Sequence, residues 1–322
     1  MHAESKKSIQ RKAITAILLV GIIPSLIVVV LTYLTSINAL KNSIGTNFQE
    51  LATETADKIQ IFMNMTIKNA KSLALAPVIV DAVSRTNRSY TDKDRGLKHA
   101  PIIGLDLQRP FSVSEYMKDY QRQRMGEYGS ILVTDSKGYV VKAINGPAER
   151  YHGEKDWWRA AYNQGRGQDY IGGIEYDKDA QTYSLAIAVP VHSKGEQKVI
   201  GVLKMTYSVK EIFNAVNMIK IGKTGHANLV TSDGMLVVCP IYPPESHRIN
   251  DRLMRQISTG KPGWGIADDD AHGGKDSIIG FAPVASTLRA GAGYFGTKAW
   301  YIFIRQFPDE TYAPMHALLW KV

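Results

Sequence analysis

An uncharged stretch near the start of the chain constrains its fold more than any other feature. No Asp, Glu, Lys or Arg occurs between Ala13 and Leu40, and the part up to Leu34 is almost wholly apolar. As a helix with a rise of ~1.5 Å per residue, 13–34 is roughly 33 Å long, enough to cross a hydrocarbon core of ~30 Å. Gly21 and Pro24 interrupt the stretch, but transmembrane helices tolerate both residue types. We therefore expect a transmembrane helix over residues 13–35.

A cleaved signal peptide is the alternative for this stretch. Signal peptides have an apolar region of only ~7–15 residues, and no small-residue cleavage site follows at Thr35–Leu40. An uncleaved anchor in the cell (inner) membrane is therefore favoured. Basic residues precede the anchor, so the positive-inside rule predicts that residues 1–12 are cytoplasmic and that residues 36–322 lie outside. These basic residues are Lys6, Lys7, Arg11 and Lys12.

Composition and charge exclude several classes of protein. At ~100–200 residues per domain, 322 residues indicate two or three folding units, and 44% hydrophobic residues are enough for a packed core. The net charge of +9 is spread thinly beyond the N-terminus and has no basic block, so nucleic acid is not an expected partner. A single cysteine, Cys239, excludes an internal disulfide and a zinc site built from several cysteines. We expect no cofactor.

A long amphipathic helix follows the anchor. Apolar residues recur mostly at intervals of three and four from Ile37 to Leu73, which predicts one helix from about residue 36 to 75 that ends before Pro77. This stalk, assigned to residues 36–80, is either a coiled coil or a helix packed along a domain. For the coiled coil we expect a parallel homodimer with Ile37–Phe62 as the contact face.

A short repeat predicts two similar modules after the stalk. The run Leu132–Gly138 is echoed by Leu229–Gly234, and each is followed by an apolar strand. The repeat fits two copies of one small α+β module with an antiparallel sheet, over residues 81–208 and 209–312, and residues 313–322 then begin a helix back to the membrane. The expected elements are hairpin strands 130–134 and 139–143, a helix 156–163, strands 169–176, 182–190 and 198–207, a helix 209–218, and strands 228–230, 235–238, 277–284 and 300–306.

Most motifs that would indicate enzymatic chemistry fail on their context. Gly291–Gly296 matches G-x-G-x-x-G, but a strand pattern follows it where a dinucleotide site needs a helix, so we expect a hairpin loop. The acidic run Asp268–Asp270 with His272 lacks the spacing of a calcium loop and predicts a solvated turn. His226 has no nearby carboxylate or nucleophile in the sequence, so it is interpreted as a structural histidine with satisfied hydrogen bonds. We expect no metal site and no enzyme.

A cluster of aromatic residues is more informative. Lys155 precedes Trp157 and Trp158 at the start of a short predicted helix, and a tyrosine-rich sheet follows it. Two indoles beside a lysine would form an amphipathic pocket for a small polar ligand. Ordinary core packing is the alternative.

The order and spacing of these segments resemble the double Cache sensor domains. The resemblance rests on Asp156–Tyr162, Tyr170–Gly172, Ala186–Val191 and Gly201–Leu203 for the membrane-distal module, and on 222–238 and 300–312 for the membrane-proximal one. It implies an N-terminal helix leaving the membrane, two tandem PAS-like modules with antiparallel sheets, and a ligand pocket in the distal module. Such domains are the extracytoplasmic parts of chemoreceptors, sensor histidine kinases and cyclase-type receptors.

The resemblance also implies a ligand site. The implied ligand-binding residues are Lys155, Trp157, Trp158, Tyr170, Tyr176, Asp177 and Thr206. Lys155 stands where amino-acid-binding members have an arginine for the ligand carboxylate, and lysine keeps the charge without the bidentate fork. Gly172 and Thr206 stand where those members have two aspartates for the ligand ammonium. We therefore expect a small carboxylate or a neutral metabolite rather than an amino acid.

Two functions remain open from the sequence. The first is the extracytoplasmic ligand-sensing region of a transmembrane signal-transduction receptor, which signals through the membrane helix. The second is a stand-alone, membrane-anchored extracytoplasmic binding protein or enzyme. No nucleophile, base and orienting group converge in the sequence, which favours the sensor.

Overall fold

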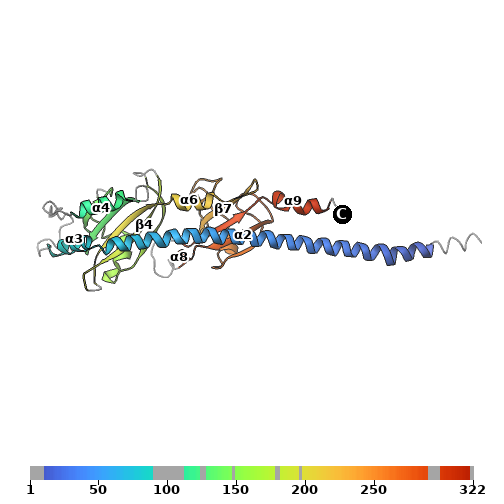
Figure 1. Ribbon diagram of the computed structural model, residues 1–322, viewed down its shortest axis with the longest axis horizontal. Coiled ribbons are helices and arrows are strands. Elements are labelled where there is room, and N and C mark those ends of the chain that lie inside the picture. Colours follow the sequence, from blue (N-terminus) through green and yellow to red (C-terminus); the bar gives the residue numbers. More distant parts are fainter. Residues whose placement is uncertain are drawn as a thin grey trace, which may run out of the picture.

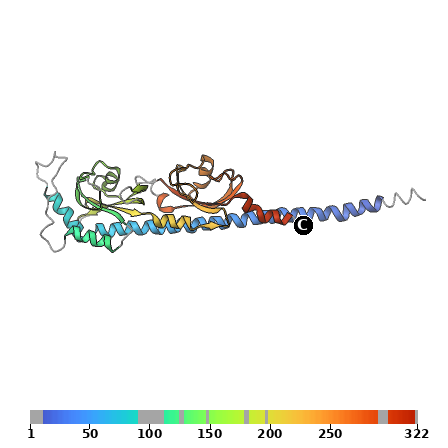
Figure 2. The same cartoon turned by 90° about the horizontal axis from the view of Figure 1, so that it is seen from above.

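The computed structural model describes residues 11–89, 112–123, 128–146, 149–177, 182–195, 198–288 and 298–319. One long helix forms the axis of the molecule, and two antiparallel sheets lie one after the other along it (Figure 1). Figure 2 shows that both sheets lie on the same side of this helix. The structure is α+β, as expected from the sequence. The basic residues Lys6 and Lys7 and the predicted hairpin loop at Gly291–Gly296 lie outside the described residues.

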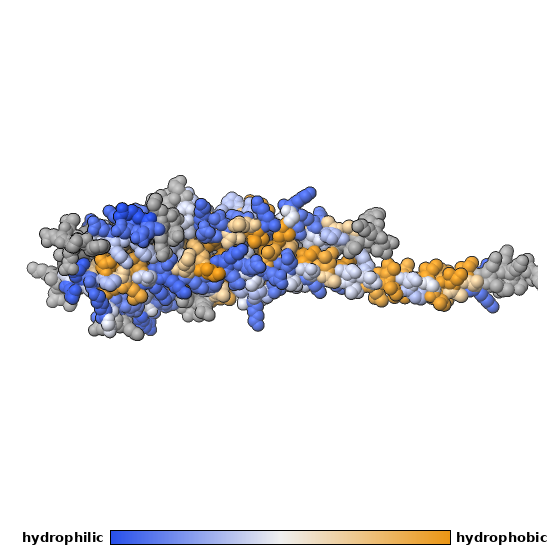
Figure 3. Space-filling view, in the orientation of Figure 1, coloured by the Kyte–Doolittle hydropathy of each residue, from blue (hydrophilic) through white to orange (hydrophobic). Residues whose placement is uncertain are grey.

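The axial helix joins the membrane segment to both sheets without a break. The chain is helical from Arg11 to Ala74 and includes a π-helical turn, η1 (Leu18–Ile22), and α2 (Ile23–Ala74). Pro24 lies at the start of α2, where the π turn accommodates its missing N–H group. The apolar window of this helix has a mean hydropathy of 2.9 and is 0% buried, which is the length and character needed to cross a membrane. Figure 3 shows apolar side chains gathered on the part that projects beyond the modules.

The distal module is built on a five-stranded sheet with helices on both faces. Its strand order is β2-β1-β5-β4-β3, and all neighbours are antiparallel. Helices α2 and α3 pack on one face of this sheet, and α5 packs on the other. The elements are α3 (Pro77–Arg88), α4 (Val113–Arg122), β1 (Tyr128–Asp135), β2 (Val140–Ile144), α5 (Asp156–Tyr162), η3 (Asn163–Gly165), β3 (Tyr170–Asp177), β4 (Thr182–His192) and β5 (Val199–Ser208).

The proximal module repeats this topology. Its sheet has the order β6-β7-β11-β10-β9 with β8 paired to β7, so β8-β7-β11-β10-β9 corresponds to β2-β1-β5-β4-β3. The duplication predicted from one short echo is therefore present in the strand order. The elements are α6 (Lys210–Asn217), β6 (Lys220–Ile221), β7 (Gly225–Thr231), β8 (Leu236–Val238), α7 (Asp251–Ile257), β9 (Gly263–Ala267), β10 (Ser277–Pro283), α8 (Ala285–Leu288), β11 (Trp300–Arg305) and α9 (Pro308–Leu319).

The echoed sequence forms equivalent turns in the two modules. Gly138 and Gly234 have φ angles of +92° and +85°, a backbone region that glycine adopts without steric cost. In the first turn Oδ1 of Asp135 accepts hydrogen bonds from the backbone N–H groups of Lys137 and Tyr139, at 2.8 and 3.0 Å. The two turns therefore share a glycine in this backbone region, whereas their side-chain hydrogen bonds differ: in the second turn Oγ1 of Thr231 donates to Oδ1 of Asp233 at 2.6 Å.

Helix α2 approaches the proximal sheet so closely that two glycines are required. A Cβ atom on Gly280 of β10 would lie 2.1 Å from the carbonyl carbon of Phe48. A Cβ atom on Gly45 would lie 2.2 Å from the indole ring of Trp264 on β9. Because neither position has room for a methyl group, these contacts fix the rotation of α2 about its own axis and its distance from the sheet.

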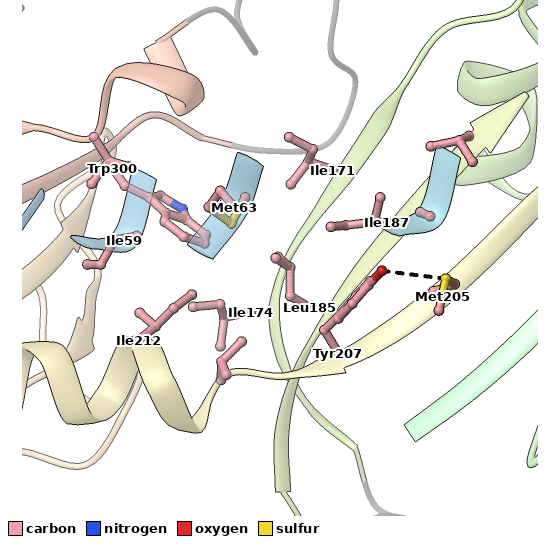
Figure 4. Close-up of a cluster of buried hydrophobic side chains, with 14 of the residues drawn as sticks. Ile59, Met63, Ile171, Ile174, Leu185, Ile187, Met205, Tyr207, Ile212 and Trp300 are labelled. Atoms are coloured by element: carbon pink, nitrogen blue, oxygen red, sulfur yellow. Dashed lines mark hydrogen bonds between the residues drawn. The ribbon is translucent and has the colours of Figure 1, made fainter. Parts of the chain in front are cut away.

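One continuous apolar core joins α2 to both sheets. Figure 4 shows Ile59 of α2 next to Trp300 of the proximal module, and Met63 between Trp300 and the distal strands. The face of α2 from Phe48 to Leu73 is buried in this core. The coiled-coil interpretation is therefore wrong for this stretch, including most of the expected dimer face Ile37–Phe62, because these residues pack within their own chain. A homodimer stays a prediction.

Boundaries and short elements account for the other differences from the sequence analysis. The axial helix ends at Ala74, and α3 begins at Pro77, where proline suits the first helical turn. The sequence analysis did not predict α3, β6, α7, β9 or α8. The last four are so short that their apolar and polar residues show neither a helical nor a strand period.

Candidate ligand-binding site

The two faces of the distal sheet have different chemistry. On β5, Leu203, Met205 and Tyr207 point into the core shared with α2, whereas Val202 packs with Trp158 of α5. Side chains alternate along a strand, so Lys204 and Thr206 also belong to the face that α5 covers. We call this surface the α5 face.

Small side chains form a row across the α5 face. In this row Gly172 of β3 lies against Ala186 of β4, so closely that a Cβ atom on Gly172 would lie 3.3 Å from the Ala186 methyl group. Ala186 pairs with Thr206 of β5, whose Oγ1 lies 3.0 Å from Oγ of Ser130 on β1. A row of small side chains keeps the surface of the sheet low, and its two hydroxyl groups are potential contacts for a ligand.

The two adjacent tryptophans on α5 have different roles. Trp158 is 8% exposed, and its indole N–H donates to Oγ1 of Thr134 at 2.9 Å. Its ring stacks on Tyr162, with centroids 4.7 Å apart. Trp158 therefore anchors α5 to the sheet, which is the core-packing alternative considered for it.

Trp157 carries the aromatic surface of the α5 face. It is half-buried, and Nζ of Lys204 lies 5.0 Å from its ring centroid, a cation–π arrangement. The ring of His152 is 5.5 Å away, and burial lowers the pKa of His152 so that it is neutral near pH 7. Trp157, Tyr162 and Tyr170 all pack against the small cluster around Trp158.

The expected cation, Lys155, lies at the edge of this site. It is the N-cap residue of α5, and its Nζ forms an ion pair with Oε2 of Glu149 at 2.9 Å. Lys204 is the lysine that lies over Trp157, and the sequence analysis missed it. Its signal is a single charged residue inside the otherwise apolar strand Val199–Ser208.

A β-bulge changes which residues of β3 reach the α5 face. The register shifts between Ile171 and Ile174, so that Ile174 pairs with Leu185 of the α2-facing core. Beyond the bulge the alternation is reversed, and Glu175 lies at an α5-face position paired with Ser184. Burial, followed by the negative charges of Glu175 and of Asp156 on α5, raises the pKa of Tyr170.

The same bulge removes Tyr176 from the predicted site. Tyr176 pairs with Tyr183, and their rings meet edge to face at 5.2 Å. Tyr183 in turn contacts Phe213 of α6, on the opposite face from α5. The backbone of Asp177 pairs with Thr182 at the end of β3. The resemblance to the double Cache family selected Tyr176 and Asp177 and passed over Glu175.

One expectation for the proximal module holds only in part, and another is wrong. Asp268 and Asp269 are exposed, but Asp270 is fully buried and paired with Arg305, whose Nε lies 2.8 Å from Oδ2, so only part of the acidic run is solvated. Nε2 of His226 is buried and has no hydrogen-bond partner among the described residues, so this histidine is not satisfied. The sequence could not show these contacts, because the partners lie on different strands and loops.

Two tandem sheets with the same strand order lie on one helix that is long and apolar enough to span a membrane, and the distal sheet has an aromatic and charged face. This architecture is typical of PAS-like sensor domains. A family model described as Cache domain matches residues 36–315. The chain belongs to the Cache domain family and is a membrane protein. The double Cache resemblance is confirmed, as is the prediction of a ligand-sensing receptor region. The alternative of a stand-alone anchored binding protein or enzyme is not favoured.

A curated relative is a receptor of the same kind. The methyl-accepting chemotaxis protein McpA of Pseudomonas putida is 24% identical over 291 residues, which cover 86% of this chain and 37% of that protein. The chain thus spans less than half the length of this relative. Relatives of this kind are sensor proteins rather than enzymes.

Solved structures with this fold correct the expected ligand. The ligand-binding domain of the Pseudomonas fluorescens chemoreceptor CtaA with L-isoleucine has a TM-score of 0.57 and 16% identity, and covers 87% of this chain and 99% of its own. That of the Pseudomonas aeruginosa chemoreceptor PctC with GABA has a TM-score of 0.52 and 17% identity, and covers 82% and 99%. The expectation that a carboxylate or neutral metabolite is favoured over an amino acid is therefore wrong. Glu175, which the sequence analysis passed over, carries a carboxylate at an α5-face position.

Proposed function

We propose that this chain is the sensing region of a methyl-accepting chemotaxis receptor and that it binds an amino acid on the α5 face of its distal module. In this proposal 13–35 crosses the membrane, 81–208 is the distal module and 209–312 is the proximal one. The relatives support the receptor class, and the solved structures support the ligand class.

The arrangement of charge around Trp157 is the observation that carries the ligand proposal. A zwitterion needs one cation and one anion on opposite sides of an apolar surface. Lys204 lies over Trp157 and would bind the ligand carboxylate. Glu175 lies at an α5-face position of β3, two strands away, and would bind the ammonium group. The hydroxyl groups of Ser130 and Thr206, on the sheet surface beneath the ligand, would form further hydrogen bonds with it.

A thermal-shift screen of the purified chain in detergent tests this assignment. A ligand that binds only the folded state stabilises it by about 2.7 kcal/mol at a hundredfold excess over Kd. We expect at least one amino acid or GABA to raise the Tm, and its descarboxy and deamino analogues to have no effect at the same concentration. No stabilisation by any of the common amino acids or by GABA would contradict the proposal.

Matched charge variants test the two polar contacts separately. Lys204→Met should abolish the shift for every amino acid, and Glu175→Gln should abolish it for ligands with a primary ammonium group. Lys194→Met is the control, because Lys194 pairs with Asp81, at 3.4 Å, away from the α5 face. Lys155→Met tests the residue predicted from the sequence, and we expect a smaller loss than for Lys204→Met.

We further propose that residues 1–12 are cytoplasmic, as the positive-inside rule predicts. A reporter active only in the cytoplasm should be silent when fused after Leu75. The same reporter fused before Arg11 should be active. Activity after Leu75 would reverse this topology.

A further inference from the structure

Three potential metal ligands converge in the proximal module, on the face away from α2. They are His226 on β7, Cys239 directly after β8, and His272 in the loop between β9 and β10. Their ligand atoms all lie within 4.8 Å of one another, and Sγ of Cys239 is 3.2 Å from Nε2 of His272. Two ligands of a tetrahedral zinc ion lie roughly 3.3–3.7 Å apart, given Zn–N of about 2.0–2.1 Å and Zn–S of about 2.3 Å. The three ligand atoms are thus at most about 1.5 Å further apart than a bound zinc ion requires.

The hydrogen bonds of both imidazoles direct a lone pair into this cluster. Nδ1 of His226 lies 3.0 Å from the carbonyl of Thr224, and Nδ1 of His272 lies 3.2 Å from the carbonyl of Asp270. A carbonyl oxygen can only accept, so each Nδ1 carries the proton and each Nε2 offers its lone pair. Metal-binding histidines are oriented by the same kind of Nδ1–H bond.

Nε2 of His226 is the second, independent indication of a ligand. His226 is only 6% exposed, and its Nε2 has no hydrogen-bond partner among the described residues. Burying an unpaired polar atom costs about 1–3 kcal/mol. Native structures therefore rarely contain one unless a water molecule, an ion or a ligand occupies the position next to it. A bound cation would remove this cost.

Backbone N–H groups around Sγ of Cys239 would stabilise a negative charge on this sulfur atom. The backbone N–H groups of Ile241 and Tyr242 both point at Sγ of Cys239, each at 3.3 Å. Such N–H donors stabilise a metal-bound thiolate. The metal would displace the thiol proton, which is released to solvent.

Buried structure holds the ligands in place before any metal binds. The carboxylate of Asp270 accepts hydrogen bonds from the N–H groups of His272 and Gly274, at 3.0 and 2.8 Å, and pairs with Arg305. The ring of Tyr242 stacks on His272, with centroids 5.2 Å apart.

We propose that His226, Cys239 and His272 form a binding site for Zn²⁺, with the fourth position open to water or another ligand. Two imidazoles and one thiolate match the borderline-soft character of this ion, whereas Mg²⁺ and Ca²⁺ prefer oxygen ligands. The site goes beyond the proposed function and does not depend on a ligand in the distal module. The sequence analysis expected no metal, because the three ligands are far apart in the chain.

The single cysteine makes the test direct. Because Cys239 is the chain's one cysteine, alkylation by iodoacetamide reports on this site alone. With the whole chain in detergent, after removal of metals by a chelator, one equivalent of Zn²⁺ should slow alkylation at least tenfold, and Mg²⁺ should not. Co²⁺ should give a sulfur-to-metal charge-transfer absorption. An unchanged alkylation rate with no such absorption would overturn the proposal without any variant.

Variants test the histidines. His226→Ala and His272→Ala should each weaken Zn²⁺ binding by about 100-fold or more in competition with a chromophoric chelator, the upper range for changes around a metal site. His247→Ala is the control, because its ring stacks on Tyr242 at 4.6 Å but it does not belong to the cluster. Equal affinity in all three variants would assign the binding to other histidines and overturn the site. Protection of Cys239 by Cu⁺ under reducing conditions, with none by Zn²⁺, would overturn the zinc assignment.

Discussion

The hydroxyl group of Tyr207 donates a hydrogen bond to the backbone carbonyl of Thr66, at 2.8 Å. Tyr207 lies on β5 and Thr66 on α2, so this bond joins the sheet that carries the α5 face to the helix that enters the membrane. The next residue back along β5, Thr206, belongs to the α5 face itself. A ligand bound on the α5 face, as proposed above, would displace β5 and pass that displacement to α2 through adjacent residues on opposite sides of one strand.

Tyr207→Phe should separate ligand binding from this coupling. We expect a loss of about 1 kcal/mol in the free energy of unfolding, measured by urea denaturation, because a buried hydrogen bond is lost while the ring still packs. Ligand affinity should change less than twofold, whereas the output of a receptor carrying the substitution should fall. Tyr183→Phe is the control, since that ring packs on Phe213 and does not reach α2 through its hydroxyl. An unchanged output in Tyr207→Phe would show that the coupling runs elsewhere.

Substitution by alanine should destabilise the chain strongly at one glycine and hardly at all at another. Gly280→Ala places a methyl group against the backbone of Phe48, which cannot move without shifting α2, so we expect a loss of about 3 kcal/mol or more. Gly173→Ala has no atom within 4 Å of the new methyl group and should change stability by less than about 0.5 kcal/mol. Urea denaturation of the two variants side by side measures this. Equal losses would show that α2 does not lie so close to β10.

The adjacent tryptophans of α5 should also differ. Trp158→Ala removes a buried ring and its hydrogen bond to Thr134, which predicts a loss of about 3–5 kcal/mol. Trp157→Ala should cost about 1 kcal/mol or less, because that ring is half-buried, yet it should abolish the ligand-induced rise in Tm. A larger loss of stability for Trp157→Ala, together with a lost ligand response for Trp158→Ala, would show that Trp157 is the structural ring and Trp158 the ligand-binding one.

The buried pair Asp270–Arg305 should behave as a unit. Asp270→Asn leaves the guanidinium of Arg305 uncompensated at a fully buried position, so we expect a loss of about 3–5 kcal/mol. The double variant Asp270→Asn, Arg305→Met should lose less than the sum of the two single variants. Additive losses in urea denaturation would contradict a direct interaction.

His152 should contribute to acid sensitivity. Burial lowers its pKa below the ordinary value of 6.5, so between the two values the unfolded chain binds more protons than the folded one. The contribution of neutral His152 to the free energy of unfolding is present in full above pH 6.5. It is lost as the pH falls from there through the lowered pKa of the folded state. We expect the Tm of His152→Gln to fall less than that of the original chain between pH 7 and pH 5. Parallel curves would show that His152 does not contribute.

The sequence predicted the parts of the fold that depend on local pattern. The membrane helix, the amphipathic part of α2 and the turns at Gly138 and Gly234 follow from hydrophobic period and turn chemistry, which neighbouring residues determine. The sequence left open whether Phe48–Leu73 packs on its own modules or against a second helix, because an amphipathic helix presents the same stripe to a sheet as to another helix.

The site was only partly predictable, and the reason is the bulge in β3. The aromatic residues Trp157 and Tyr170 lie on the α5 face, as the sequence indicated. One extra residue at Gly172–Gly173 then reverses which side chains of β3 face α5. As a result Glu175, and not Tyr176, lies on the α5 face. The cluster of His226, Cys239 and His272 depends on three separate segments of the chain meeting, and no local pattern indicates that.

The closeness of α2 to the proximal sheet gives the membrane segment a defined angular phase. Phe48 is fixed against Gly280, and the helix continues unbroken from there into the apolar segment. Each residue added between Leu34 and Gly45 would turn the membrane segment by about 100° relative to the modules, while seven added residues would leave it only about 20° out of phase. The direction in which the membrane helix faces its surroundings is thus set by the number of residues in that interval, and not by their identity.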